Sequence, residues 1–411
     1  MAFKPAPRSL TRRLNEQAVL DVIFHEGPIS RANVAGLTGL SKPTVSSIVD
    51  QLERGGLVRP TGQTAGAVGR SATLYHIDAR VGHVVGIDLG GSKVTAAIAD
   101  LYGRLLGEHT EPTVTADPDA LVEQLREIGR RTAAEAGIAW SSVRAIVLGA
   151  PGTVDPATGV ISLTTNIPDV HGRNLARELA TNSEVQIVVE NDVNLAAVGE
   201  RWKGFARECE SYALLAIGTG VGCGLVIDGE LHRGARGGAG EIAFLPIGGE
   251  PFDPANRRRG ALEEAVGGDA LAELARRLRA GGCATSLPDT FTTADVFEAA
   301  RTGDGLALQV VDHAARLIAL AIASLCATVA PELIVLGGPV GANVLLIDSV
   351  RAYVAELTPF EPPRIEQSAL HDRGTLIGAV AVALQEARAV VLAPPGSERV
   401  GKTPLVTSDL I

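Results

Sequence analysis

Three glycine-rich segments have the residue types and spacing needed to bind phosphate groups. Asp88-Leu89-Gly90-Gly91-Ser92-Lys93 places a carboxylate at the end of an apolar strand, before two glycines whose N–H groups could approach an anion. Gly218-Thr219-Gly220-Val221-Gly222 repeats this arrangement after a second apolar strand, and Gly337-Gly338 forms a third such turn. A single glycine turn says little, but three of them predict a cleft that binds a nucleotide between two lobes.

A carboxylate with possible catalytic chemistry follows another apolar strand. Asp192, in Glu190-Asn191-Asp192, is expected at the carboxyl end of the strand 185–189, where α/β folds place their ligand sites. It could accept a hydroxyl proton during phosphoryl transfer, while Asn191 holds a neighbouring hydroxyl. The alternative is a helix N-cap, since Asn and Asp are common caps. This segment alone does not decide between the two.

The first 80 residues indicate a different function, because they read as helix, helix, glycine turn, helix and then two short strands. Ser30 and Ser41 can cap the second and third helices, and the strands 57–59 and 72–77 flank a glycine-rich tip at 61–70. This order predicts a winged helix whose third helix enters the major groove of DNA. The alternative is a winged helix that contacts only proteins. The candidate DNA-binding residues are Arg31, Ser41, Lys42, Thr44, Ser46 and Ser47, with Arg70 at the wing tip.

The elements that must position these groups divide the chain into four parts. We expect a winged helix-turn-helix domain at 1–80, a first α/β lobe at 81–200, a second α/β lobe at 201–390 and a loosely ordered tail at 391–411. Similar strand and glycine-turn patterns open both lobes, which predicts two related copies. Residues 1–80 hold ten Lys and Arg against six Asp and Glu, whereas the remainder holds 27 against 41. Only the basic head is therefore expected to meet nucleic acid.

Composition narrows the class of protein further. The 411 residues are 46% hydrophobic, and we find no apolar run close to the ~20 residues of a membrane span. No signal-peptide pattern is present, so a cytoplasmic location and no membrane partner are expected. The four cysteines lie far apart, which argues against a disulfide framework.

Together these motifs resemble the ROK family (repressors, open reading frames, kinases), in particular its long members with an N-terminal winged helix. The resemblance runs from about residue 14 to 384. It implies an actin-like, two-lobed sugar kinase fold, with Asp192 in the position of the kinases' general base. It also implies that the first two glycine segments are phosphate loops and that Gly337-Gly338 is the adenosine turn. The sugar-binding residues that it implies are Gly152, Thr165, Asn166, Asn191, Asp192, Glu241 and Glu263.

One loop departs from the family pattern. Phe244 stands where the family usually has a zinc-binding His, and Pro254, Asn256 and Ala261 stand at its three cysteine positions. None of these four side chains is a zinc ligand of the usual kind, so we expect no metal here. Glu241 and Glu263 remain, and a sugar or sugar-phosphate ligand is still expected. No cofactor is expected to be required, and ATP and magnesium would be needed only if kinase activity is retained.

Three functions follow from these observations. The first is a DNA-binding regulator, expected to be a repressor, whose kinase-like body senses a sugar. The second is an active ATP-dependent sugar kinase that carries a DNA-binding head, and the third is a regulator that senses a nucleotide or a partner protein. The basic head favours a regulator, and the retained hydroxyl-binding residues favour a sugar. A regulator that reads a palindromic operator needs two heads, so a homodimer or homotetramer is expected.

Overall fold

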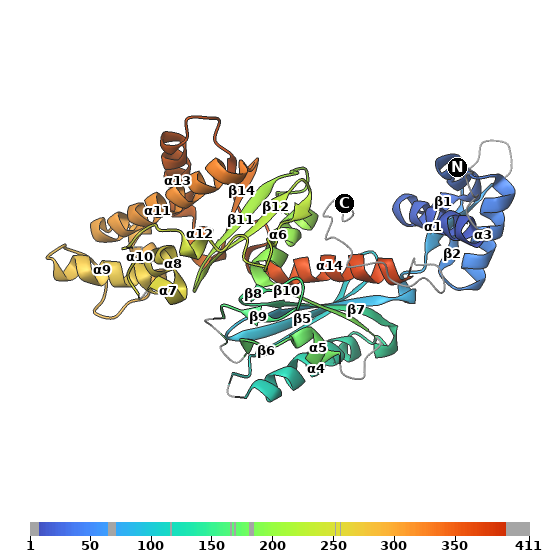
Figure 1. The fold of residues 1–411 in the computed structure, drawn as a ribbon, viewed down its shortest axis with the longest axis horizontal. Helices are drawn as coiled ribbons and strands as arrows, with labels where there is room; N and C mark the ends of the chain where they lie inside the picture. The colour runs from blue at the N-terminus through green and yellow to red at the C-terminus, as the bar shows by residue number, and fades with distance from the viewer. Residues whose placement is uncertain are drawn as a thin grey trace, which may run out of the picture.

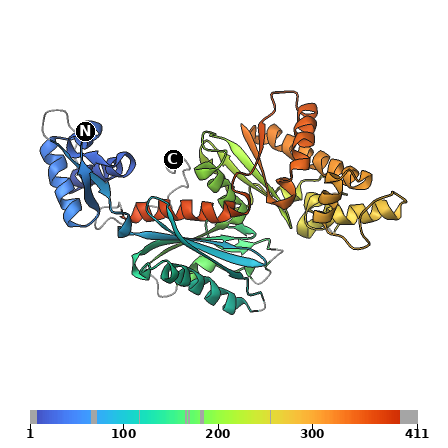
Figure 2. The same cartoon turned by 180° about the vertical axis from the view of Figure 1, so that it is seen from behind.

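The computed structural model describes residues 8–64, 71–115, 117–164, 167, 170–180, 185–250, 252–254 and 256–391. These residues form a small N-terminal head and a larger body with two lobes. The head lies at one end of an elongated molecule and the second lobe lies at the other (Figure 1), and the view from behind gives the same order (Figure 2).

The head is a winged helix, as predicted. Its helices are α1 (Arg8–Glu26), α2 (Arg31–Thr38) and α3 (Lys42–Arg54), and its strands β1 (Ile29–Ser30), β2 (Val58–Gln63) and β3 (Thr73–Ile77) form an antiparallel sheet in the order β1-β3-β2. The side chains of Ser30 and Ser41 cap α2 and α3. Between these helices Gly39 adopts φ +69°, a left-handed conformation that favours glycine.

The first lobe is built on a five-stranded sheet in the order β10-β7-β4-β5-β6. The predicted antiparallel meander is β4 (His83–Leu89), β5 (Lys93–Asp100) and β6 (Leu105–Pro112). The strands β7 (Val143–Ala150) and β10 (Gln186–Asn191) extend the sheet in parallel. The helices α4 (Pro118–Glu135) and α5 (Leu175–Leu179) cover one face, and a small hairpin, β8 (Thr153–Val154) and β9 (Ile161–Ser162), borders the second lobe.

The second lobe repeats this topology, which confirms the predicted relation between the lobes. Its sheet has the order β13-β12-β11-β14-β15. If the five strands of each sheet are counted in chain order, both sheets have the order third, second, first, fourth, fifth when they are read from the edge formed by β6 or β13. Helices cover its outer face. The strands are β11 (Tyr212–Ile217), β12 (Val221–Ile227), β13 (Glu230–Leu231), β14 (Leu333–Gly337) and β15 (Arg364–Gln367); the helices are α7 (Asn256–Arg259), α8 (Ala261–Val266), α9 (Ala270–Ala280), α10 (Thr293–Arg301), α11 (Gly305–Val329), α12 (Gly338–Gly341) and α13 (Val344–Leu357).

Two helices, α6 (Asp192–Lys203) and α14 (Gly374–Val391), pack together between the two sheets. They approach so closely that a Cβ on Gly378 would lie 1.8 Å from the carbonyl oxygen of Leu195, and one on Gly199 would lie 2.6 Å from that of Gly374. Because α14 also packs on β4 and β7, it belongs to the first lobe. This corrects the predicted second lobe at 201–390. The predicted tail overlaps α14 at residue 391, and residues 392–411 lie outside the described part.

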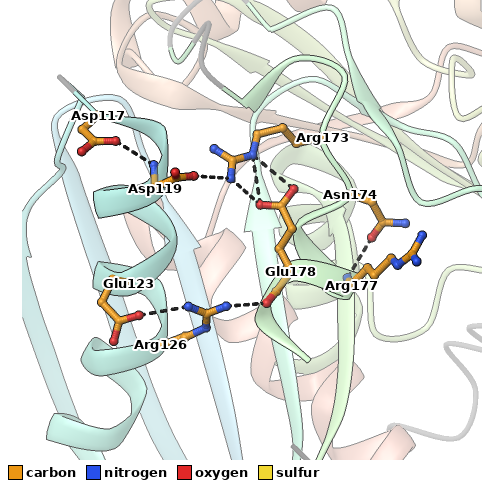
Figure 3. Close-up of polar contacts among 8 residues, drawn as sticks. All are labelled: Asp117, Asp119, Glu123, Arg126, Arg173, Asn174, Arg177 and Glu178. Carbon is orange, nitrogen blue, oxygen red and sulfur yellow. Dashed lines mark hydrogen bonds and ion pairs between the residues drawn. The ribbon is translucent and has the colours of Figure 1, made fainter. Parts of the chain in front are cut away.

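Ion pairs attach the segment behind the β8–β9 hairpin to α4 (Figure 3). Arg173 contacts Asp119 at 3.1 Å and Glu178 at 2.5 Å, and the Arg126 guanidinium donates a hydrogen bond to the Glu178 carbonyl oxygen at 2.6 Å. Arg173 and Glu178 are both only partly exposed, so their ion pair is less screened than a free surface pair, whereas Asp119 is exposed. These contacts attach α5 and the residues just before it to α4.

Two described helical runs are long and apolar enough to cross a membrane, namely α11 and residues 371–391, which include α14. This corrects the expectation that no such apolar run exists. Most of each run is buried against the rest of the protein, as in the core helices of a globular fold. Their apolar character is therefore explained by internal packing.

Candidate functional site

A cavity of about 330 Å³ lies between the two lobes and contains most of the predicted ligand-binding residues. Both glycine loops and the end of β10 reach it, so residues far apart in the sequence share one site. The predicted residues that line it are Gly90, Gly91, Gly152, Asn191, Asp192, Gly218, Thr219, Gly220, Gly222, Glu241, Glu263 and Gly338. The lining therefore combines carboxylates with loops that have little side-chain bulk.

Four predicted residues in the described part lie outside this lining: Asp88, Ser92, Lys93 and Gly337. The Lys93 ammonium group contacts Asp372 at 3.4 Å on the surface, which makes it a weak candidate for a phosphate ligand. Thr165 and Asn166 lie outside the described residues, so their predicted role stays a prediction.

The end of β10 and the start of α6 combine a helix cap with a carboxylate in the cavity. The Asn191 side chain accepts a hydrogen bond from the N–H of Asn194 at 2.9 Å, which makes it the N-cap of α6. Its amide group also donates to the Gly152 carbonyl oxygen and to the Asp192 carboxylate, each at 3.0 Å. The capping alternative is therefore confirmed for Asn191, whereas Asp192 remains in the cavity with a carboxylate that the cap helps to orient.

Two further carboxylates reach the cavity from the second lobe, and they differ in their partners. The buried Glu263 side chain accepts hydrogen bonds from the N–H of Val221 at 2.9 Å and from Arg259 at 2.8 Å. The carboxylate of Glu241, in contrast, accepts no hydrogen bond within the described part of the chain. Glu241 is therefore the carboxylate that is more available to bind a hydroxyl group of a ligand.

Three acids in or near the cavity, Asp192, Glu241 and Asp88, have raised pKa values. Burial raises the pKa of Asp192 to about 6, although hydrogen bonds from Val193 and Asn191 oppose the shift. Burial, together with the charges of Asp192 and Glu263, raises the pKa of Glu241 to about 7. Burial and the charge of Asp192 likewise raise the pKa of Asp88 to about 7. These groups would exchange protons near neutral pH, a property typical of functional sites.

The residues at the family's four zinc-ligand positions are Phe244, Pro254, Asn256 and Ala261. Phe244 lines the cavity, and Asn256 uses its amide group to donate to the Glu250 carbonyl oxygen at 2.7 Å. Across the described residues, no three His, Cys, Asp or Glu side chains come together as a metal-binding group. The donors that zinc prefers are thus missing from the loop, and the absence of bound zinc stays a prediction.

The residues that the sequence analysis missed are Arg258 and Arg259, which line the cavity from α7. Arg259 links Glu263 to the second glycine loop, because its guanidinium also donates to the Thr219 carbonyl oxygen at 3.4 Å. The three consecutive arginines at 257–259 were a visible signal, since they lie inside the loop that lacks the zinc ligands.

The head presents a polar surface at the start of α3. Ser41, Lys42 and Ser47 are exposed, whereas Val45, Ile48 and Val49 are buried in the core of the head. Thr44 and Ser46 are partly exposed, and the Thr44 hydroxyl bonds with the capping Ser41 hydroxyl at 2.7 Å. This division between polar and apolar faces is what a recognition helix requires.

Two other predicted DNA contacts, Arg31 and Arg70, stay predictions. Arg31 forms an ion pair with Asp50 at 2.7 Å and donates a hydrogen bond to the Tyr75 hydroxyl at 2.6 Å, so its guanidinium stabilises the head internally. Its predicted role in DNA binding stays a prediction. Arg70 lies outside the described residues.

The structure combines a two-lobed body with a winged helix-turn-helix head. Comparison with known proteins identifies the family that has this combination. The model of the ROK family matches residues 84–386, and a model of winged helix-turn-helix DNA-binding domains matches residues 12–59. The chain belongs to the ROK family.

Named relatives include both regulators and kinases. The chain is 25% identical over 390 residues to the xylose repressor of Caldicellulosiruptor bescii, an alignment that covers 92% of this chain and 97% of the repressor. The structure of the ROK hexokinase from Thermus thermophilus is 32% identical with a TM-score of 0.62, and it covers 74% of this chain and 99% of the hexokinase. The structure of a ROK family transcriptional regulator, a homologue of the Escherichia coli MLC protein, shares the fold over 93% of this chain and 98% of its own, at 24% identity and a TM-score of 0.76.

Proposed function

We propose that this protein is a DNA-binding transcriptional regulator, acting as a repressor, that binds a sugar or sugar phosphate in the cavity between its lobes. One observation carries the proposal: the chain joins a winged helix with an exposed polar recognition helix to a kinase-like cavity lined by Asp192, Glu241 and Glu263. The alignment with a named repressor extends over both parts of the chain, which further supports a regulator.

The cavity suits a ligand rich in hydroxyl groups. Glu241 reaches it from the second lobe and Asp192 from the first, so one sugar could be held from both sides. Carboxylates with raised pKa values can serve sugar hydroxyls as acceptors when ionised and as donors when protonated. A ligand bound to both lobes would favour a closed arrangement and would alter DNA affinity only by its different affinity for the two arrangements.

We further propose that the regulator works as a homodimer or homotetramer in the cytoplasm and needs no cofactor. Two heads would read two halves of a palindromic operator, which ties the operator spacing to the symmetry of the protein. The Arg259 guanidinium contacts both Glu263 and the Thr219 carbonyl oxygen of the second glycine loop, which supports sugar binding that does not depend on zinc.

The second candidate is an active sugar kinase, favoured by one observation: Gly90, Gly91 and the loop Gly218–Gly222 reach the same cavity as Asp192. ATP with magnesium would supply the phosphoryl group there. The glycine loops would let backbone N–H groups approach the phosphates, and Asp192 would accept the proton of the sugar hydroxyl.

The test combines ligand screening with DNA binding. We would record thermal unfolding with D-xylose, D-glucose, N-acetyl-D-glucosamine and their phosphates, each with and without ATP and magnesium. A sugar at 100 times its Kd should stabilise the protein by about 2.7 kcal/mol. The same sugar should change the affinity for a DNA fragment that the protein itself selects from a random library. The kinase would be favoured if a sugar binds without changing the DNA affinity and ADP is released when ATP and magnesium are present.

A further inference from the structure

The head docks on the body through a stack of aromatic rings. Tyr102 lies in the turn between β5 and β6 of the first lobe, and its ring stacks on Phe24 of α1 with centroids 5.2 Å apart and planes 2° apart. The ring of His76, on β3, also stacks on the Tyr102 ring, with centroids 4.4 Å apart. In addition, the Tyr102 hydroxyl accepts a hydrogen bond from the N–H of Ile77 at 3.1 Å. One side chain of the body thus contacts two elements of the head.

The end of α14 completes this contact. The Arg388 guanidinium lies 4.2 Å from the centroid of the Phe24 ring and donates a hydrogen bond to the Leu101 carbonyl oxygen at 3.3 Å. A cation over an aromatic face is attracted by the ring's negative surface. We call Phe24, His76, Tyr102 and Arg388 the head joint.

The helices α6 and α14 both run from the cavity to the head joint. At the cavity, α6 begins with Asp192, and the Thr375 hydroxyl in the first turn of α14 donates a hydrogen bond to the Asp192 carbonyl oxygen at 3.1 Å. With 18 residues, α14 is about 27 Å long at 1.5 Å per residue. It extends along the first sheet to the side where the head lies (Figures 1 and 2).

At their other ends both helices hold the turn that carries Tyr102. Gly103, at φ +75°, lies so close to Trp202 of α6 that a Cβ there would be 2.4 Å from the ring, and 2.9 Å from Leu384 of α14. The Lys203 ammonium group donates to the Gly103 carbonyl oxygen at 3.5 Å. Because the glycine contacts between the helices leave almost no free space, α6 and α14 are expected to move as one unit.

We propose that the head joint sets the orientation of the DNA-binding head, and that the paired helices α6 and α14 carry the state of the cavity to it. A shift of Asp192 on ligand binding moves the start of both helices, and the close packing passes this shift to the Tyr102 turn. The second part of this proposal, coupling of the cavity to the head, rests on the proposed function. The first part, orientation of the head by the head joint, does not.

The first experiment measures whether the head moves with the body. A dye is attached to Cys at position 37 in a Leu37→Cys, Cys283→Ser protein, because Leu37 is an exposed residue of the head and Cys283 is the one native cysteine that is not buried. Time-resolved fluorescence anisotropy then separates slow tumbling of the whole protein from faster motion of the head. Tyr102→Leu and the milder Arg388→Met are expected to add a faster component.

The matched controls are Tyr353→Leu and Arg316→Met. These residues form a similar cation-π pair in the second lobe, with the guanidinium 4.6 Å from the ring centroid, and they do not contact the head. The controls are expected to leave the anisotropy decay unchanged. Joint variants whose decays equal that of the wild type would overturn the orientation part.

The second experiment measures coupling, using the DNA fragment and the sugar identified by the screen described above. Both joint variants are expected to keep sugar affinity within twofold, while the ratio of DNA affinities without and with sugar falls toward one. A ratio equal to that of the wild type would overturn the coupling part. If no sugar in the screen binds the wild type, the proposed function fails, and the anisotropy experiment still decides the orientation part.

Discussion

The Asp192→Asn exchange is expected to make the protein more stable above neutral pH while weakening its response to sugar. Burial raises the pKa of Asp192 from 3.8 to about 6, so the site opposes ionisation of this group. A shift of roughly two pKa units corresponds to about 3 kcal/mol. The free energy of unfolding is lower by this amount when the folded protein holds Asp192 in its charged form. An asparagine keeps an oxygen that can accept the hydrogen bond from Val193, and it removes the charge.

The pH dependence follows from which state holds the proton. Between about pH 4 and pH 6 the unfolded chain has lost a proton that the folded protein still binds, so the free energy of unfolding falls as pH rises through this window. Asp192→Asn abolishes this fall. Its gain over the wild type should therefore approach zero near pH 4 and reach at most about 3 kcal/mol at pH 8.

Urea unfolding between pH 4.5 and pH 8, followed by the fluorescence of Trp140 and Trp202, measures this difference. Trp202 lies on the same helix as Asp192 and reports on its unfolding directly. Asp348→Asn serves as the control, because this exposed residue of α13 is remote from the cavity lining. A gain for Asp192→Asn that is absent at pH 8, or equal at pH 5 and pH 8, would refute the assignment of a buried charge.

The same variant tests the sensor. We expect Asp192→Asn to require more sugar for release of DNA, with sugar-free DNA affinity within about twofold of the wild type, under ~0.5 kcal/mol. A wild-type sugar response would place the sensor elsewhere and would favour a regulator that senses a nucleotide or a partner protein.

Three further predictions concern the recognition helix, the metal and the ion pair between Arg259 and Glu263. Replacing Lys42, Thr44 and Ser46 with Ala should abolish binding to the selected DNA without changing the unfolding of the body, and an unchanged gel shift would contradict the recognition-helix assignment. Protein purified without added metal should contain well below one zinc per chain by elemental analysis and should melt at the same temperature with a chelator; stoichiometric zinc would show that the loop at 254–263 was misread. Arg259→Gln should destabilise the body by roughly 1–3 kcal/mol in urea and weaken sugar binding, because the buried Glu263 loses its cationic partner, whereas Arg257→Gln should do neither.

Much of the fold was predictable because local patterns determine it. Ser30, Ser41 and Gly39 define the ends of two helices by side-chain capping and backbone conformation, both of which act within a few residues. The similar meanders at the start of each lobe also follow from local strand and turn patterns. For these reasons the winged helix and the relation between the lobes were both predicted and confirmed.

Properties that depend on packing between distant segments were not predictable in this way. The sequence of α14 is rich in Ala, Val and Gly, but nothing local shows that it packs on β4 and β7, which lie more than 200 residues earlier in the chain. The contacts of Arg31 with Asp50 and Tyr75 likewise join residues that only the folded head brings together. Asn191 fits both a cap and a ligand residue in sequence, and only the contact from Asn194 identifies the cap.

The cavity combines features that are costly for stability and that a sensor can use. Raised pKa values at Asp192 and Glu241 indicate that the cavity solvates these carboxylates poorly. A sugar would supply hydroxyl donors to the ionised groups and would thereby recover part of that cost. This stabilisation of the carboxylates is greatest when both lobes contact the ligand. The ligand therefore binds the closed arrangement more tightly than the open one. This preference is the quantity that a regulator needs, and it requires neither phosphoryl transfer nor zinc.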